Sequence, residues 1–257
     1  MMAKQSGLGD NLYVSGYDVS GDVGQVGNIA GPLATLDVTG IDKEANERIG
    51  GLRDGAIEFT AFWNPERATD NPGVTRDRAH AVLSTLPTAD RHVMYCRGTQ
   101  LGNQAACLVS KQINYDPSRG DDGSFTLAVS AQANGFGLEW CTQLTPGKRT
   151  DTAATNGPAV DLVAPTTFGL QAYLQVFAFT GTSATIKLQE SSDNGAADAW
   201  TDVVDGSFAA VAGVTEQRIQ TARDQTVERY LRVVTEGTFT QLVFAVAVAK
   251  NEVEVSF

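Results

Sequence analysis

Histidine and cysteine are scarce in this chain of 257 residues, which has two of the first and three of the second. No cysteine or aspartate lies near His80 or His92 at the spacing of a metal site. Neither histidine pairs with an obvious nucleophile and acid, as a catalytic base would. Cys96, Cys107 and Cys141 are odd in number and form no C-x-x-C pair, which favours buried thiols over a disulfide framework. G-x-S-x-G is absent as well. We therefore expect no enzyme, no metal site and no cofactor.

An excess of basic residues and a long apolar segment are also missing. The 19 Lys and Arg against 30 Asp and Glu give a formal net charge of −11, which disfavours nucleic-acid binding through a basic patch. The longest apolar run, residues 242–249, is too short to span a bilayer as a helix. Residues 1–10 lack the apolar core of a secretion signal. We expect a soluble chain, made inside the cell, that binds no membrane.

Glycine, in contrast, is abundant. The 26 glycines are spread among short apolar runs, a distribution that favours many turns and strands over long helices. Gly21, Gly24 and Gly27 follow no apolar strand and precede no helical pattern, so they are not a dinucleotide-binding turn. They predict a flexible loop or an irregular hairpin.

Periodicity predicts the elements that follow. Residues 56–63 alternate, with Ile57 and Phe59 on the buried face, and predict a strand. Apolar residues recur at helical spacing between Val74 and Leu86 and predict a single helix, which ends before Pro87. Two further alternating runs, 107–115 and 125–131, are joined by a polar turn at 116–123 and predict a hairpin.

The composition changes after Gly147. Residues 148–158 are polar and small and have no periodicity, so we expect two domains, 1–150 and 161–257, joined by a linker at 151–160. Short alternating runs with turn signals between them predict an Ig-like or jelly-roll-like β-sandwich for the second domain. These runs are residues 173–180, 186–189, 200–203, 216–221, 230–235 and 241–250.

The last of these runs has two apolar faces. Leu242, Phe244, Val246 and Val248 form the expected core face, and the small residues between them form a shallow second face. That second face needs a cover, which could come from the same domain or from a neighbouring molecule. Residue patterns alone therefore indicate a mainly β, two-domain protein that assembles or binds.

A family resemblance rests on residues 36–65, LDVTGIDKEANERIGGLRDGAIEFTAFWNP. This segment resembles the amino-terminal region of major tail proteins, or tail tube proteins, of long-tailed siphovirus-type phages, particularly those of actinobacterial hosts. The family follows this run with a helix and a closing G-x-E-W and L-T-P-G segment, which here are residues 137–140 and 144–147. The resemblance covers residues from about 10 to about 150.

The resemblance implies a structural role in the virion tail. Such proteins fold as a small β-sandwich or barrel flanked by one helix, with a long extended loop or hairpin. They form hexameric rings that stack into a tube around the tape-measure protein. The partners implied are further copies of the chain, the tail terminator and the distal tail proteins, with DNA only passing through the lumen. The extra carboxyl-terminal sandwich would project outward as a decoration, and assembly would take place in the host cytoplasm.

The resemblance also implies roles for residues in and around the extended loop. Residues 47–55 are expected to be a flexible arm or bend, anchored by the strand that follows. The residues expected at a subunit interface are Gly50, Gly51, Leu52, Arg53 and Asp54. Those expected to face the lumen are Asp42, Glu44 and Glu47.

A second function is left open by the sequence. The chain could be a virion decoration protein, or a receptor-binding protein whose carboxyl-terminal sandwich binds glycan. Trp200 and Tyr230 are then the aromatic residues expected to stack on sugar rings, although aromatic residues in a sandwich are more often part of its core.

Overall fold

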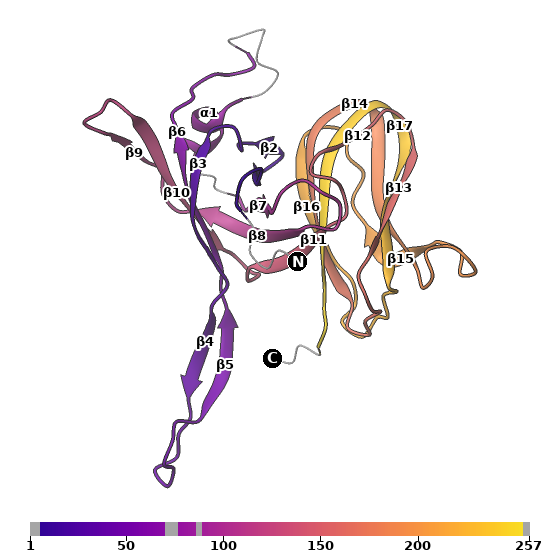
Figure 1. Cartoon of the computed structure of the whole chain (residues 1–257), viewed down its shortest axis with the longest axis horizontal. Coiled ribbons are helices and arrows are strands. Elements are labelled where there is room, and N and C mark those ends of the chain that lie inside the picture. The colour runs from indigo at the N-terminus through magenta and orange to yellow at the C-terminus, as the bar shows by residue number, and fades with distance from the viewer. Residues whose placement is uncertain (1–5, 70–76, 86–88, 254–257) are drawn as a thin grey trace. The chain divides into compact units, whose positions relative to one another are not determined.

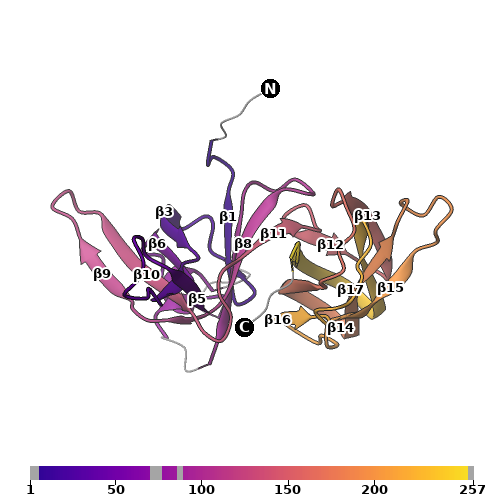
Figure 2. The ribbon, with the colours of Figure 1, turned by 90° about the horizontal axis from the view of Figure 1, so that it is seen from below.

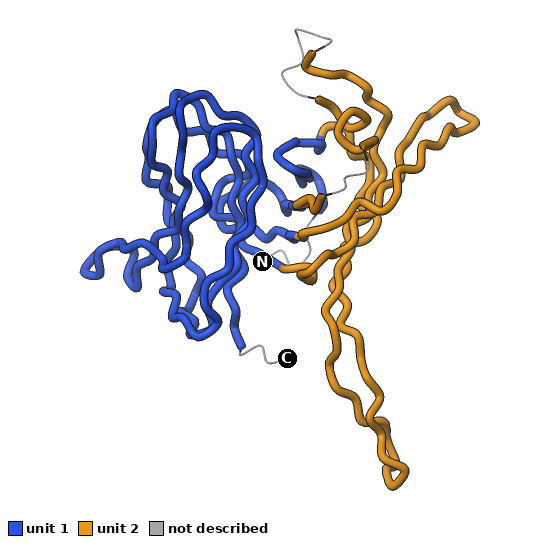
Figure 3. The backbone as a smooth tube through the Cα atoms, turned by 180° about the vertical axis from the view of Figure 1, so that it is seen from behind, with its two compact units in different colours: residues 1–20, 94–107, 140–257 blue, residues 21–93, 108–139 orange. Residues whose placement is uncertain are grey.

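The computed structural model describes residues 6–69, 77–85 and 89–253, and its chain divides into two compact units (Figure 3). Unit 1 contains residues 1–20, 94–107 and 140–257, and unit 2 contains residues 21–93 and 108–139. The described part is mainly β with one short helix, which confirms the predicted fold class. Within the described ranges, no helix is long and apolar enough to cross a membrane.

The division into units differs from the division at residue 150 expected from the sequence. Residues 1–20 and 94–107 belong to the same compact unit as the carboxyl-terminal hundred residues. The chain passes between the units within β7 (Arg91–Cys96), β8 (Gln104–Gln112) and β11 (Glu139–Gln143). Composition cannot reveal such a division, because it depends on which distant segments pack together.

Unit 2 is an antiparallel sheet in which β6 (Ala56–Phe62) lies between β3 (Val23–Ala30) and β10 (Phe125–Ala133). Strand β10 also pairs with β9 (Asp116–Arg119) and with the last residues of β8. Figure 2 shows β9 and β10 extending from this sheet as a hairpin. The predicted alternation of β6 is confirmed, since Ile57, Phe59 and Ala61 are at most 3% exposed. The predicted hairpin is confirmed too, although its first arm continues through β9.

The predicted helix is found in a shorter form. Helix α1 spans Ala79–Leu83 and buries Ala79, Ala81 and Leu83. Residue Arg78 before it is extended, so the helix begins later than its pattern predicts. Residues 74–76 and 86–87 of the predicted helix lie outside the described residues.

Two long antiparallel strands, β14 (Leu170–Ser191) and β17 (Tyr230–Lys250), form the centre of unit 1 (Figure 1). The sequence predicts two shorter strands in place of each. The register shifts near Gly181, which lies against Phe239: a Cβ at Gly181 would lie 2.4 Å from the Phe239 Cα. A glycine is therefore required there for the long strands to continue without a break.

Every other sheet strand of the carboxyl-terminal segment pairs with one of these two. Strands β15 (Thr201–Ser207) and β16 (Thr215–Gln220) pair with β14. Strands β11, β12 (Arg149–Asp151) and β13 (Thr155–Asp161) pair with β17. Because β13 hydrogen-bonds to β17, the residues expected to form a linker at 151–160 are largely part of the sheet.

The second face of β17 is covered from within unit 1. The segment of β1 (Asn11–Val14) and β2 (Tyr17–Asp18) packs against β14, the strand beside β17, and the Tyr13 and Phe177 rings pack edge to face with centroids 4.8 Å apart. The Gly16 amide donates to Gln175 Oε1 at 2.5 Å, and both Ala245 and Ala247 are buried. The alternative that the sequence left open, a cover from a neighbouring molecule, is therefore not needed here.

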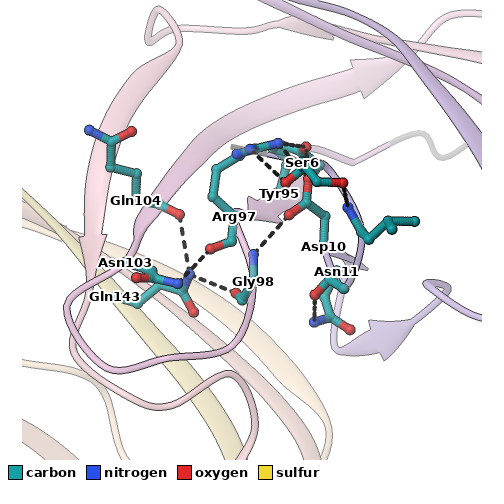
Figure 4. Close-up of polar contacts among 11 residues, drawn as sticks. Ser6, Asp10, Asn11, Tyr95, Arg97, Gly98, Asn103, Gln104 and Gln143 are labelled. Atoms are coloured by element: carbon teal, nitrogen blue, oxygen red, sulfur yellow. Dashed lines mark hydrogen bonds and ion pairs between the residues drawn. The ribbon is translucent and has the colours of Figure 1, made fainter. Parts of the chain in front are cut away.

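A polar cluster fixes the start of this covering segment (Figure 4). The Asp10 carboxylate accepts from Arg97 Nη1 at 2.7 Å, from the Gly98 amide at 2.9 Å and from the Tyr95 hydroxyl. Arg97 also donates to the Ser6 carbonyl at 3.2 Å. Burial, followed by the hydrogen bond to Asp10, raises the pKa of Tyr95. The charge-assisted bonds hold the amino-terminal segment against the residues that follow β7.

A buried ion pair lies where β12 meets β17. Arg149 donates to Asp151 through Nε at 2.8 Å and Nη2 at 2.7 Å, and both residues are at least nine-tenths buried. Arg149 also donates to the Val233 carbonyl at 2.9 Å, and Thr235 Oγ1 donates to Asp151 at 2.7 Å. This pairing explains why the polar start of the expected linker is held in the interior.

Removing one member of this pair should destabilise unit 1 strongly. We expect Asp151→Asn to lower the free energy of unfolding by about 3–5 kcal/mol, because it leaves the buried Arg149 charge without a counter-ion. Urea denaturation of the full chain measures this. The matched control is Asp161→Asn, which disrupts the exposed pair with Arg229 and should have a much smaller effect. If the two variants lose the same free energy of unfolding, burial of the Arg149–Asp151 pair does not determine its contribution to stability.

Candidate assembly site

An exposed apolar surface of unit 2 is a two-stranded hairpin, which we call the arm (residues 33–53). Its strands β4 (Leu33–Asp37) and β5 (Arg48–Arg53) pair with each other and with no other described strand. Figure 1 shows the arm projecting from the β3–β6–β10 sheet. A two-stranded hairpin is marginally stable in water by itself, so an exposed arm of this kind is suited to being covered.

Apolar side chains are exposed along both strands and at the tip of the arm. Ile41 is fully exposed, and Leu52 is 84% exposed. The other exposed apolar side chains of the arm are Leu33, Leu36, Val38 and Ile49, each about half exposed. Burial of one such side chain stabilises an assembly by about 1.5–3 kcal/mol. The arm can therefore contribute substantially to association.

The tip of the arm is ordered by its own hydrogen bonds. Thr39 Oγ1 accepts from the Glu47 amide at 2.8 Å, and the Thr39 amide donates to Asp37 Oδ1 at 2.9 Å. The hydrogen bonds from Thr39 lower the pKa of Asp37. Lys43 lies 3.6 Å from the Glu47 carboxylate. The tip therefore has a defined shape in the isolated chain, which reduces the entropy lost on binding.

The residues expected to face a lumen lie at this tip. Asp42, Glu44 and Glu47 are all exposed, and Lys43 contacts Asp42 as well as Glu47. Nothing in a single chain tests which surface a lumen would occupy, so this assignment stays a prediction.

The five residues expected at a subunit interface divide into two groups. Gly50, Gly51 and Leu52 lie in β5, where the antiparallel pairing with β4 shifts register between Gly50 and Arg53, so this part of the expected flexible arm or bend is an irregular strand of the arm. Leu33 lies over Gly50, with its Cδ2 atom 3.2 Å from the position that a Cβ would take. Glycine thus leaves room for an apolar side chain of the opposite strand. The interface role itself stays a prediction.

Arg53 and Asp54 belong to the root of the arm. Arg53 Nη2 donates to the Leu138 carbonyl at 3.2 Å, and the Asp54 amide donates to the Pro32 carbonyl at 2.9 Å. Asp54 Oδ1 accepts from the Gly55 amide at 2.7 Å. Their contacts fix the short connection through which β5 continues into β6.

An unprotected sheet edge is a feature that the sequence did not predict. Among the described strands β3 pairs with β6 alone, so one of its sides is an edge of the unit 2 sheet. Its sequence, VGQVGNIA, has no charge and no proline, the features that usually protect an edge from pairing. The opposite edge strand β9 has Pro117 between Asp116 and Ser118. Its glycines predicted a flexible loop or an irregular hairpin, and Gly24 and Gly27 lie where the pairing of β3 with β6 shifts register.

The two aromatic residues expected to bind glycan lie against arginines. The Arg232 guanidinium lies 4.5 Å from the Trp200 ring centroid, and Arg229 lies 4.9 Å from that of Tyr230. The backbone of Gly195 also lies against Trp200, since a Cβ there would be 2.5 Å from Nε1. The expected role of Trp200 and Tyr230 in glycan binding stays a prediction.

The ionisable groups form no cluster typical of a metal site. In the portions of the chain that the structure describes, no three His, Cys, Asp or Glu residues converge to hold an ion. All three cysteines are buried outside any disulfide of the described residues, and burial raises the pKa of Cys96 to about 12. A thiol of this kind is a poor nucleophile at neutral pH.

Comparison with known proteins gives no family assignment. No protein-family model and no curated protein matches the chain. Among solved structures, the Dit protein of phage SPP1, described as a paradigm of the hub adsorption apparatus in phages that infect Gram-positive bacteria, matches at a TM-score of 0.36 and 13% identity. That match covers 93% of this chain and 98% of the other. A chain of the phage P2 baseplate in its activated conformation matches at 0.32 and 11%, over 95% and 99%. Likenesses this weak assign neither a fold family nor a function.

The root of the arm should tolerate change less well than the arm itself. A Cβ at Gly55 would lie 2.6 Å from the Leu138 amide nitrogen and 2.9 Å from Leu108 Cδ1. We expect Gly55→Val to lower the stability of unit 2 by about 1–3 kcal/mol through overpacking. In contrast, Gly50→Val meets only the flexible end of Leu33 and should fold normally. Thermal unfolding compares the two, and equal stability would contradict this account of the root.

Proposed function

We propose that this chain is a structural protein of a phage tail that assembles with copies of itself, and more specifically a tail tube subunit that forms stacked hexameric rings. The observation that carries the proposal is the arm, an ordered hairpin that exposes apolar side chains along its length. The sequence resemblance of residues 36–65, which contain most of the arm, supports the same role. The tube would be the conduit for DNA ejection.

The sheet edge at β3 supports association through backbone pairing. An uncharged edge strand is normally a liability, but it becomes a binding surface when the edge of another copy pairs with it. Contacts between unlike surfaces of identical subunits close into rings when the rotation between subunits permits it. Arm contacts that leave the plane of a ring would let rings stack. The arm and the β3 edge together provide two different kinds of contact.

The charge of the chain is compatible with a channel for DNA. A net charge of −11 repels phosphate groups and limits adhesion of the passing nucleic acid. In this role the chain would contact the tape-measure protein inside the tube and the tail terminator and distal tail proteins at its ends. It would need no cofactor and perform no catalysis.

Electron microscopy with mass measurement on the purified protein tests the proposal. Rings or tubes with a central hole are the expected result, and a ring mass of about six chains follows from the resemblance. A stable monomer or trimer that binds cell-wall glycan would instead favour the decoration or receptor-binding alternative. No contact of Trp200 or Tyr230 favours that alternative at present, because arginine side chains already cover part of both rings.

Charged substitutions on the arm should block assembly without unfolding the chain. We expect Ile41→Asp and Leu52→Asp to keep the wild-type melting temperature, because both side chains are exposed, and to sediment as monomers. The matched control is Leu8→Asp, which changes an apolar side chain that is 90% exposed outside the arm and should assemble normally. If both arm variants form rings as efficiently as the control, the arm is not an assembly element.

A further inference from the structure

A cavity of about 470 Å³ lies at one end of unit 1, beside the end of β13. It opens to solvent and is lined by the loop between β13 and β14 (residues 162–168), by Thr226 and by residues 250–252 at the end of β17. Its walls include the apolar side chains of Leu162, Pro165 and Phe168. Cavities of a few hundred Å³ with apolar walls and a few polar groups are typical of small-molecule sites.

The loop that forms the wall is held rigidly. Thr166 and Val227 exchange backbone hydrogen bonds at 2.9 and 2.8 Å, and Asn251 Nδ2 donates to the Phe168 carbonyl at 2.7 Å. The Gly169 amide donates to the Gln225 carbonyl at 2.9 Å. The cavity is therefore formed before any ligand arrives, which reduces the entropy that binding costs.

A strained residue forms part of the rim. Val163 has φ 72°, a conformation that a β-branched residue rarely adopts, and its side chain is 79% exposed. The strain is held in place by Asp161, which accepts from the Val163 amide at 2.8 Å and from Arg229 at 2.7 and 2.6 Å. Arg229 lowers the pKa of Asp161 to about 2. Backbone strain of this kind costs about 1–3 kcal/mol and persists where the surroundings enforce it, often at binding sites.

Lys250 supplies a cation inside the cavity wall. Its Nζ donates to the Leu162 carbonyl at 3.2 Å and to the Ala164 carbonyl. An ammonium group has three donors, so one is left for a ligand. Burial lowers the pKa of Lys250, which means that its charged form gains from an additional acceptor.

The remaining polar groups of the cavity are both donors and acceptors. The side chains of Thr167, Thr226 and Glu252 line it and make no hydrogen bond with any other described residue. The carboxylate of Glu252 disfavours an anionic ligand, and a purely apolar ligand would leave Lys250 and Glu252 desolvated and unpaired. A matching ligand must therefore be neutral or cationic, carry several hydroxyl groups and have an apolar face.

Carbohydrates have this combination of groups, because a sugar ring carries hydroxyls at its edge and C–H groups on its faces. We propose that this cavity, which we call the Lys250 cavity, binds a saccharide of one or two rings. Its hydroxyls would accept from Lys250 and donate to Glu252, and its apolar face would pack on Phe168 and Pro165. The inference does not depend on the tail role, since it concerns a cavity wholly within unit 1.

Saturation-transfer NMR on the full chain tests this with three disaccharide probes, maltose, lactose and N,N′-diacetylchitobiose, up to about 10 mM, a range that covers weak binding. At least one probe should bind saturably. Lys250→Met and Glu252→Gln should each weaken that binding by roughly fivefold or more, the effect of losing one hydrogen bond. Both substitutions keep the shape of the side chain.

Two control variants separate this cavity from other surfaces. Glu236→Gln changes an exposed carboxylate elsewhere on β17, and Trp200→Ala removes the aromatic residue that the sequence favoured. Both should bind as the wild type does. The proposal is overturned if none of the three probes binds saturably, or if Trp200→Ala abolishes binding while Lys250→Met does not. Neither result bears on the assembly proposal, because ring formation is measured in a separate experiment.

Discussion

Pairing between β14 and β17 is the constraint on which unit 1 depends. The two strands run antiparallel from Leu170 opposite Lys250 to Ser191 opposite Tyr230, and the strands of the carboxyl-terminal segment pair with one or the other. Their core faces meet in one apolar cluster that includes Leu174, Val176 and Phe244. Such long strands stay paired because glycines permit the close approach where the register shifts.

The same ladder explains why the amino terminus belongs to unit 1. Small residues on the second face of β17 leave space above them, and Tyr13 and Phe177 fill that region together with the turn at Gly16. The Asp10–Arg97 pair then fixes the segment that leads into β1. A carboxyl-terminal fragment without residues 6–20 would lose the contacts that Tyr13 and Gly16 make with β14.

Local patterns predicted the elements well where one face is buried and the other is exposed. The alternation in β6, where Ile57, Phe59 and Ala61 are buried and Glu58 and Phe62 are exposed, could be recognised because burial of one face imposes a period of two. The prediction of a linker at residues 151–160 was wrong for a different reason. Arg149 and Asp151 are buried as a pair, and a polar sequence carries no sign of the partner that makes its burial possible. The assignment of residues 6–20 to unit 1 likewise depends on contacts that no local pattern encodes.

The candidate site shows the same limit. The sequence predicted a flexible arm or bend at residues 47–55, but not the contacts of Arg53 and Asp54 with Leu138 and Pro32 at the root. The sequence could not show that Leu36, Ile49 and Leu52 are exposed, because alternating apolar residues usually indicate a buried face. Their exposure follows from the absence of any described strand beside β4 and β5 other than each other. An ordered apolar hairpin without a partner in its own chain is the physical basis of the assembly proposal.

Hydrogen–deuterium exchange at the backbone amides of the arm, measured on the monomer and on the assembled protein, tests this claim most directly. Arm amides should exchange rapidly in the monomer and become strongly protected on assembly, since a neighbouring copy would cover them. Amides of β14 and β17 should be protected in both states and serve as the internal reference. Assembly that leaves exchange in the arm unchanged would contradict the account.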